Sequence, residues 1–240
     1  TIPLPMTNDR PTPETALEPI HVVLPMRTVS GGKARLGEAL DAEEREELVL
    51  GMLLHTLEVL GEWPVCRRIH LVSPDPVLSA ATSQAGVEVS VHRQAGVGLN
   101  EGIRLGVSAA RVEDATSLLV LPGDLPLLSV EALDELLTAA DAGVVAAAGG
   151  PLVAIVPSDA GGGTNALLLR PPDAIAPAFG LGSFEAHLRA AEAAGAAVQV
   201  VSDPALGFDL DTPDDLERLD PERLRELTAL GRGAVDGVSV

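Results

Sequence analysis

Residues 118–126 read Leu-Leu-Val-Leu-Pro-Gly-Asp-Leu-Pro, an aliphatic run followed by a turn sequence that carries one carboxylate, Asp124. An aliphatic run bounded by turn residues predicts a strand that is buried on both faces, as in a parallel sheet. Ser129 then provides an N-cap for a helix that the spacing of the following leucines predicts. This stretch therefore predicts one β/α unit with a polar group just beyond the end of its strand.

The same alternation of short aliphatic runs and helical patterns extends outward from this unit in both directions. It predicts an α/β fold: a single Rossmann-like domain with a mostly parallel sheet flanked by helices. Asp41, with Glu44 three residues later, marks the start of a helix that continues through Leu60. Further strands are expected at 21–24, 69–72, 87–91, 152–156, 166–169, 198–201 and 206–211, and further helices at 98–110 and 183–195.

The 240 residues fit one large domain. Residues 1–19 contain five prolines and few consecutive apolar residues, so we expect a disordered N-terminal tail. Residues 20–219 are expected to form the folded domain, and residues 220–240 a C-terminal helix and a frayed tail. No apolar run reaches the roughly 18 residues of a membrane span, and a single cysteine fits a reducing compartment, so we expect a cytoplasmic protein without a membrane partner.

The formal net charge of −19 argues against nucleic acid as a partner, because binding a phosphate backbone requires clustered cations. Aromatic residues make up only 2 % of the chain, which argues against stacking platforms for single-stranded nucleic acid. A small anion such as a nucleotide can still bind through backbone amides, a few basic side chains, or a divalent metal ion held by carboxylates. Such groups are expected at the carboxyl ends of the strands, where ligands bind in open α/β sheets.

Asp209-Leu210-Asp211 ends the strand expected at 206–211. Residues i and i+2 of an extended chain face the same side, so the two carboxylates would lie together while Leu210 packs inward. Two like charges side by side are unfavourable unless a cation lies between them, and Mg²⁺ prefers oxygen ligands. The pair therefore predicts a magnesium site, more strongly if Asp124 lies near. Structural roles stay open: Asp124 closing a turn, Asp209 solvated, and Asp211 supporting the next helix.

Two glycine-containing loops are candidates for binding an anion. Gly161-Gly162-Gly163-Thr164-Asn165 joins two expected strands, and consecutive glycines let backbone N–H groups approach a ligand closely. Phe179-Gly180-Leu181-Gly182-Ser183 leads into an expected helix, whose N-terminal amides and dipole favour a phosphate or carboxylate. A flexible turn explains the first loop equally well. Together with the carboxylates, the two loops suggest a phosphorylated substrate beside a metal ion.

The main basic cluster follows the first expected strand. Arg27, Lys33 and Arg35 place three cations within nine residues of an otherwise acidic chain, and a nucleotide triphosphate is their expected ligand. The spacing matches neither the P-loop nor the dinucleotide-binding fingerprint, and an exposed surface loop stays an alternative. Asn100, at the start of an expected helix, is a candidate contact to the nucleotide base, although helix capping explains it equally well.

Nucleophilic catalysis lacks candidates in this sequence. There is no Gly-x-Ser-x-Gly motif, and Cys66, beside Trp63 and Pro64, fits a structural role. His187 lies one turn after Ser183 on the same helical face, where a structural hydrogen bond is favoured over a contact to the anion. The other histidines show no metal-ligand spacing; they are His21, His55, His70 and His92.

With these segments identified, the chain resembles the CofC/FbiD family, the guanylyltransferases of deazaflavin coenzyme F-420 biosynthesis. Each matching motif is unspecific alone, but together, in the family's order, they are specific. They are 33–36 (Lys-Ala-Arg-Leu), 72–75, 98–100, 122–126, 162–167, 179–187 and 209–213. The chain departs from the family at Arg27, where Lys is common, and at Ala34, where Ser or Thr is usual.

The resemblance implies a fold of the nucleotide-diphospho-sugar transferase type and a defined reaction. GTP and a phosphorylated three-carbon acid, phosphoenolpyruvate or 2-phospho-L-lactate, would give a guanosine diphospho adduct and pyrophosphate. The implied site residues are Asp124, Asp209 and Asp211 as catalytic ligands of Mg²⁺; Lys33 as a further catalytic residue that binds GTP with Arg27, Arg35 and Asn100; and Thr164, Gly180 and Ser183 as the binding site for the acceptor's phosphate.

Two alternatives stay open. The same scaffold serves nucleotidyltransferases that act on a sugar phosphate or a molybdopterin-type cofactor, and a non-catalytic module that binds a nucleotide would keep the same loops. Analogy with bacterial members of the family favours phosphoenolpyruvate as the acceptor. A homodimer is compatible with the sequence, although no segment is an evident interface.

Overall fold

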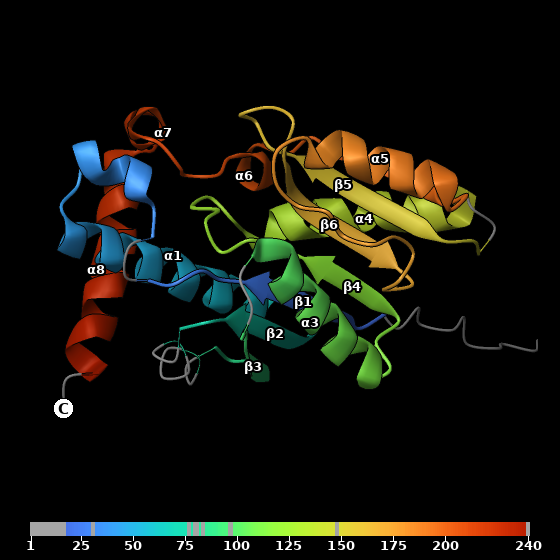
Figure 1. Ribbon diagram of the computed structural model, residues 1–240, viewed down its shortest axis with the longest axis horizontal. Helices are drawn as coiled ribbons and strands as arrows, with labels where there is room; N and C mark the ends of the chain where they lie inside the picture. Colours follow the sequence, from blue (N-terminus) through green and yellow to red (C-terminus); the bar gives the residue numbers. More distant parts are fainter. Residues whose placement is uncertain are drawn as a thin grey trace, which may run out of the picture.

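The computed structural model describes residues 18–238 except 30–31, 76–77, 79–81, 83–84, 96–97 and 147–148, so most of the expected N-terminal tail lies outside the described residues. At its centre, the described strands form one sheet in the order β3-β2-β1-β4-β6-β5-β7 (Figure 1). All neighbouring strands are parallel except the pairs formed by β6, which confirms the predicted α/β fold. The strands are β1 (Ile20–Pro25), β2 (Cys66–Ser73), β3 (Val89–Arg93), β4 (Ser117–Val120), β5 (Leu152–Pro157), β6 (Thr164–Arg170) and β7 (Ala197–Val200).

Helices cover both faces of this sheet. Side chains alternate along β1, so Val22 joins the core on one face and Val23 the core on the other. Helices α1 and α4 pack their leucines on the first face, and α3 and α5 cover the second. The described helices are η1 (Ala34–Glu38), α1 (Ala42–Glu62), α3 (Leu99–Val112), α4 (Val130–Ala146), α5 (Ser183–Ala193), α6 (Pro204–Gly207), α7 (Pro213–Arg218) and α8 (Pro221–Val238).

The C-terminal helix α8 crosses α1 and packs closely against it (Figure 1). A Cβ at Gly51 in α1 would lie 1.8 Å from the Leu227 carbonyl oxygen, and a Cβ at Gly231 in α8 would lie 1.7 Å from the Glu47 carbonyl oxygen. Only glycine lets the two helix backbones come this close. Arg232 adds an ion pair with the buried Glu47, with Nε and Oε1 2.8 Å apart. The predicted C-terminal helix is therefore part of the same folded body as the sheet.

Replacing Gly231 with alanine is expected to lower the free energy of unfolding by about 1–3 kcal/mol, because the methyl group forces α8 away from α1. Gly233 is the matched control, since a Cβ there meets nothing within 4 Å. Gly233→Ala should be neutral or should stabilise the protein by up to about 1 kcal/mol through helix propensity. Urea unfolding measures both variants, and equal stability of Gly231→Ala and the wild type would contradict the close contact.

The expected strand at 206–211 is wrong. Residues 204–207 form helix α6, and residues 208–211 lie outside the sheet. Asp203 starts the helix, because its Oδ1 accepts from the N–H groups of Ala205 and Leu206 at 2.9 and 2.8 Å. Pro204 follows at the first helical position, where its fixed backbone angle suits a helix. This start signal outweighs the short apolar run that suggested a strand.

One edge of the sheet collects several strand ends. The parallel strands β1, β4 and β5 end at this edge, whereas β6 begins there because it runs antiparallel to β4 and β5. Thr164, the first residue of β6, therefore lies at the edge where the loops after β1, β4 and β5 begin. This is the edge at which the sequence predicts the ligand site.

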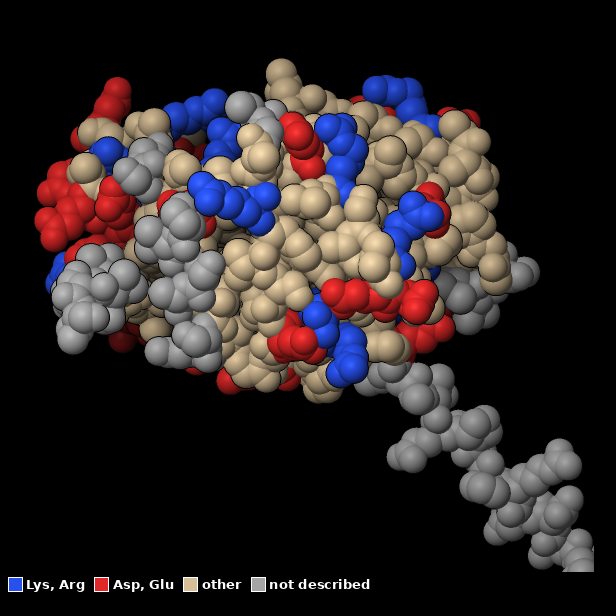
Figure 2. Space-filling view, turned by 60° about the horizontal axis from the view of Figure 1, so that its bottom comes forward, with Lys and Arg blue, Asp and Glu red and all other residues tan. Residues whose placement is uncertain are grey.

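The charged side chains on the described surface are distributed as expected for an acidic chain. On the face shown in Figure 2, basic side chains are dispersed among neutral and acidic ones, and acidic side chains gather at the left end. This distribution agrees with the formal net charge of −19. None of the described helices is both long enough and apolar enough to cross a membrane.

Candidate active site

Lys33 lies between two carboxylates that come from distant parts of the sequence. It follows β1, precedes η1, and has a left-handed backbone with φ 51°. Its Nζ donates to Asp124 Oδ2 at 2.6 Å and to Asp211 Oδ1. A left-handed backbone costs a residue with a side chain about 1–3 kcal/mol and is typical of functional sites. Asp124 and Asp211, two of the three carboxylates in the magnesium prediction, therefore lie close together, and the metal ion itself stays a prediction.

The charge on Lys33 is stabilised by these two carboxylates. Burial by itself would lower the pKa of the ammonium group, but Asp124 and Asp211 outweigh burial and raise the pKa above its ordinary value. The pair is asymmetric, because the Asp211 side chain is 45 % exposed whereas Oδ1 of Asp124 is buried and has no hydrogen-bond partner. A buried carboxylate oxygen without a partner is costly, so it marks a position that a ligand would satisfy.

Asp209 faces different partners at the same edge. Its Oδ1 accepts from Ser158 Oγ at 2.8 Å and from Asn165 Nδ2 at 3.1 Å. Leu210 is buried, as the sequence predicts, and donates its backbone N–H to the Asp124 carbonyl oxygen at 3.2 Å. This bond joins the segment that carries Asp209 and Asp211 to the loop after β4.

The three carboxylates suit Mg²⁺ in chemistry but do not form one tight group. Among the described residues, they are not a set whose ligand atoms all lie within 4.8 Å of one another. Lys33 lies between Asp124 and Asp211, and Asp209 is held by Ser158 and Asn165. All three carboxylates offer the hard oxygen ligands that Mg²⁺ prefers, and Oδ1 of Asp124 lacks any other partner. A metal ion and Lys33 would therefore compete for Asp124 and Asp211.

Thr164 is held by His187, and the hydrogen bonds fix the tautomer of that ring. The Ala178 N–H donates to His187 Nε2 at 2.9 Å, so this nitrogen carries no proton. Burial lowers the pKa of His187 to about 4, so the neutral ring keeps its proton on Nδ1 and donates to Thr164 Oγ1 at 3.0 Å. The hydroxyl of Thr164 accepts this bond and keeps its own proton available for an anion. His187 thus makes the structural hydrogen bond that the sequence analysis favours, and this bond leaves the hydroxyl proton of Thr164 free to be donated to a ligand.

Replacing His187 with alanine is expected to raise KM for the acceptor that the resemblance implies by about 10-fold, the equivalent of one hydrogen bond, with a smaller change in kcat. His187→Asn should raise this KM less, because the asparagine amide can still donate a hydrogen bond near the position of Nδ1. Arg189, exposed on the same helix, supplies the control variant Arg189→Ala. Steady-state kinetics with varied acceptor at saturating nucleotide make the comparison; an unchanged KM in His187→Ala would show that Thr164 needs no partner.

The two glycine loops meet at the N-terminus of α5. Phe184 donates its N–H to the Gly162 carbonyl oxygen at 3.2 Å, which ties the helix to the first loop. Gly180 and Gly182 have φ angles of 125° and 73°, a backbone conformation that other residues rarely adopt. Ser183 begins α5, and its Oγ is buried without a hydrogen-bond partner. An unpartnered hydroxyl at a helix N-terminus fits the predicted phosphate site.

Asn100 has a structural partner in this arrangement. Its Nδ2 donates to the Phe179 carbonyl oxygen at 2.8 Å, and its Oδ1 accepts from the Phe179 N–H at 2.7 Å. The pair ties the start of α3 to the loop before α5, so Asn100 positions that loop. A contact of Asn100 with the base stays a prediction. The same holds for the contacts of Arg27 and Arg35 with GTP; both side chains are exposed.

Ser158 is not predicted as functional from the sequence, and Asn165 is included there only as part of the candidate glycine loop 161–165. Ser158 follows β5 directly, so the rule on strand ends could have found it. Asn165 follows Thr164 in β6, and its Nδ2 also donates to the Gly207 carbonyl oxygen at 2.8 Å. Ser158 and Asn165 fix Asp209 at the edge of the sheet where β6 begins.

The chain is similar in sequence to proteins of one family. The family model described as "Guanylyl transferase CofC like" matches residues 20–220. A phosphoenolpyruvate guanylyltransferase of Rubrobacter xylanophilus is 41 % identical over 201 residues, which cover 84 % of this chain and 93 % of that protein. A 3-phospho-D-glycerate guanylyltransferase of Colwellia psychrerythraea is 30 % identical over 200 residues, which cover 83 % and 90 %. A solved structure, a nucleotidyl transferase from Methanothermobacter thermautotroptrophicus, has a similar fold, with a TM-score of 0.57 and 19 % identity over 86 % of this chain and 98 % of that chain.

Proposed function

Because the chain belongs to the family of CofC-like guanylyl transferases, we propose that it transfers the guanylyl group of GTP to a phosphorylated three-carbon acid and releases pyrophosphate. Phosphoenolpyruvate is the acceptor we favour, since the relative from Rubrobacter xylanophilus is named for it. The proposal includes the role in coenzyme F-420 biosynthesis that the resemblance implies. The observation that carries it is the Lys33 bridge to Asp124 and Asp211 at the edge where β6 begins.

The proposed chemistry requires neutralisation of charge more than a nucleophilic side chain. A phosphate monoester has a second pKa of about 6, so the attacking oxygen of the acceptor is already ionised at neutral pH. This agrees with the side chains at hand, because burial raises the pKa of the Cys66 thiol to about 12 and His187 is committed to Thr164 and Ala178. The obstacle to reaction is the repulsion between two polyanions, which the site must hold in line.

In the proposed reaction, a phosphate oxygen of the acceptor bonds to the α-phosphorus of GTP, while the bond from that phosphorus to the β-phosphate oxygen breaks and pyrophosphate leaves. Thr164 and Ser183 donate their hydroxyl protons to the acceptor's phosphate, and Gly180 contributes its backbone N–H. Lys33 supplies positive charge beside the triphosphate. When bound, Mg²⁺ would neutralise phosphate charge and orient the reacting oxygens; its ligands would be Asp124, Asp209 and Asp211.

The test is pyrophosphate release from GTP and Mg²⁺ with each of four acceptors: phosphoenolpyruvate, 2-phospho-L-lactate, 3-phospho-D-glycerate and a sugar phosphate. Mass spectrometry of the product identifies the adduct, and CTP in place of GTP is the control for the nucleotide. We expect pyrophosphate release with a phosphorylated three-carbon acid as the acceptor and with GTP, but not CTP, as the nucleotide. Release only with the sugar phosphate, or GTP binding without release under any condition, would contradict the proposal.

A further inference from the structure

Three histidines form a line across the sheet that starts at the edge opposite to the candidate active site. His21 lies near the start of β1, His70 in β2 and His92 in β3, and the ring centroids of each neighbouring pair are 5.3 Å apart. The strand register explains the line, because His70 is opposite Val23 and His92 is opposite Val72, each two residues beyond the preceding histidine. Spacing along the sequence shows no sign of this cluster, since neighbouring strands bring its members together.

Hydrogen bonds join the three rings in their neutral form. His21 Nδ1 lies 3.0 Å from His70 Nε2, and His70 Nδ1 lies 3.1 Å from His92 Nε2. One shared proton satisfies each pair, so no ring needs to be charged. Burial lowers the pKa of all three rings, that of His70 to about 3. Neutral imidazole is also the form that binds metal ions.

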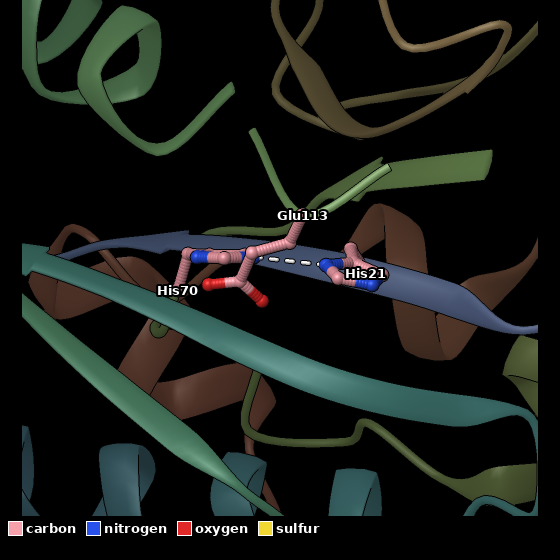
Figure 3. A group of neighbouring side chains, drawn as sticks. All are labelled: His21, His70 and Glu113. Carbon is pink, nitrogen blue, oxygen red and sulfur yellow. Dashed lines mark hydrogen bonds between the residues drawn. The ribbon is translucent and has the colours of Figure 1, made fainter. Parts of the chain in front are cut away.

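Glu113 completes a group of potential ligands. It follows α3 and reaches the first two histidines (Figure 3), where the C-terminal end of the helix favours positive charge. One ligand atom each of His21, His70 and Glu113 lies within 4.8 Å of the other two, and the described residues contain no other group of this kind. In Figure 3 the two rings project from neighbouring strands, and the carboxylate lies beside the gap between them.

We propose that His21, His70 and Glu113 bind a transition-metal ion such as Zn²⁺, at a site separate from the carboxylate cluster. His21 would offer Nδ1, His70 Nε2 and Glu113 one carboxylate oxygen. Two imidazoles and one carboxylate favour Zn²⁺, Co²⁺ or Ni²⁺ over Mg²⁺, which prefers oxygen ligands. Tetrahedral bonds of about 2.1 Å require the two nitrogens to be about 3.4 Å apart. From their present 3.0 Å the two nitrogens must move apart by a few tenths of an ångström, and both rings must turn so that their lone pairs point at the ion.

His92 orients the ring of His70 for this role. A metal on Nε2 requires the proton of His70 to lie on Nδ1, which then donates to His92 Nε2. Metal-binding histidines commonly donate their second N–H in this way, and loss of the partner costs about 10–100-fold in affinity. The line of three rings therefore contains both a ligand and the group that fixes its tautomer.

Arg68 competes with a metal ion for Glu113. Its Nε lies 2.9 Å from Glu113 Oε2, while another guanidinium nitrogen lies 2.5 Å from Glu88 Oε1. Metal binding must draw the Glu113 carboxylate away, and Arg68 then keeps Glu88 and the hydroxyl of Ser90, 3.0 Å away. The guanidinium thus weakens the site, and its removal should strengthen metal binding. A residue with a purely structural role would not produce this direction of change.

The test is a titration of the full chain with Co²⁺, followed by visible absorption, with excess Mg²⁺ present to saturate the carboxylate cluster. Wild type should take up one Co²⁺ per chain, which Zn²⁺ then displaces. His21→Gln and Glu113→Gln should weaken binding by about 10-fold or more, and Arg68→Gln should tighten it. His55→Gln is the matched control, because His55 is also buried but bonds the Leu128 carbonyl oxygen at 2.9 Å.

A second measurement is the effect of Zn²⁺ on Tm. Zn²⁺ should raise Tm in the wild type and in His55→Gln but not in His21→Gln, and circular dichroism confirms that each variant is folded. The proposal is overturned if the wild type shows no saturable Co²⁺ binding under excess Mg²⁺, or if His21→Gln and Glu113→Gln bind as tightly as the wild type. An Arg68→Gln chain that binds no more tightly would overturn Glu113 as a ligand.

Discussion

Asparagine in place of Asp209 or Asp211 is expected to reduce turnover by about 1,000-fold or more while leaving the fold intact. At position 209 the amide oxygen can still accept from Ser158 and Asn165, so the contacts survive while the charge is lost. At position 211 the partly exposed side chain loses its ion pair with Lys33. The loss of activity would therefore report the negative charge itself, which is what a metal ligand must supply.

The measurement is kcat with GTP and phosphoenolpyruvate at saturating Mg²⁺. Asp214→Asn is the matched control, since Asp214 is an exposed acidic residue in the first turn of α7, and it should retain turnover. Urea unfolding of all three variants separates a chemical effect from a loss of fold. Near-normal Mg²⁺-dependent turnover in Asp209→Asn or Asp211→Asn would remove that residue from the proposed machinery.

Lys33→Met is expected to lower kcat/KM by about 100-fold or more. Methionine keeps much of the apolar stem but removes the ammonium group that bridges Asp124 and Asp211. Two like charges then face each other beside a buried oxygen that already lacks a partner. Lys33→Arg should restore only part of the activity, because a planar fork does not replace a point charge between two carboxylates.

The same variant tests whether Lys33 and Mg²⁺ share their carboxylates. If they do, the Mg²⁺ concentration that gives half-maximal rate should be no higher in Lys33→Met than in the wild type. The maximal rate of the variant should be much lower. Arg225→Met, on the exposed side of α8, controls for the loss of one positive charge elsewhere. A Lys33→Met enzyme with the rate of the wild type would show that the bridge has no part in turnover.

Local signals predict most elements of this fold. Asp41 and Glu44 form a reciprocal capping box at the start of α1, with bonds of 3.0 and 2.8 Å, and Thr212 caps α7. Such signals act within a few residues, so they can be identified in the sequence. The direction of β6 cannot be predicted in this way, because it depends on pairing with β4 and β5 across the sheet.

The site shows the same division. The sequence predicts Asp124 from its place after an expected strand and Lys33 from the basic cluster that follows the first strand. It also predicts Asp211, although the strand expected at 206–211 is absent. That Lys33 bridges the two carboxylates depends on how three distant loops meet, which no local pattern records. The role of Asn100 in holding Phe179 and the line of histidines are likewise results of tertiary packing.

The reversed direction of β6 has a consequence for how such enzymes diversify. Thr164 and Ser183, the proposed donors to the acceptor, lie in one contiguous stretch that includes β6 and the start of α5, whereas Lys33 and Asp124 precede it. On the proposed assignment, substitutions within that stretch would change which small acid binds and leave the contacts to the nucleotide unchanged. Relatives named for two different phosphorylated acids, yet sharing one guanylyl chemistry, are the outcome that such a modular chain would produce.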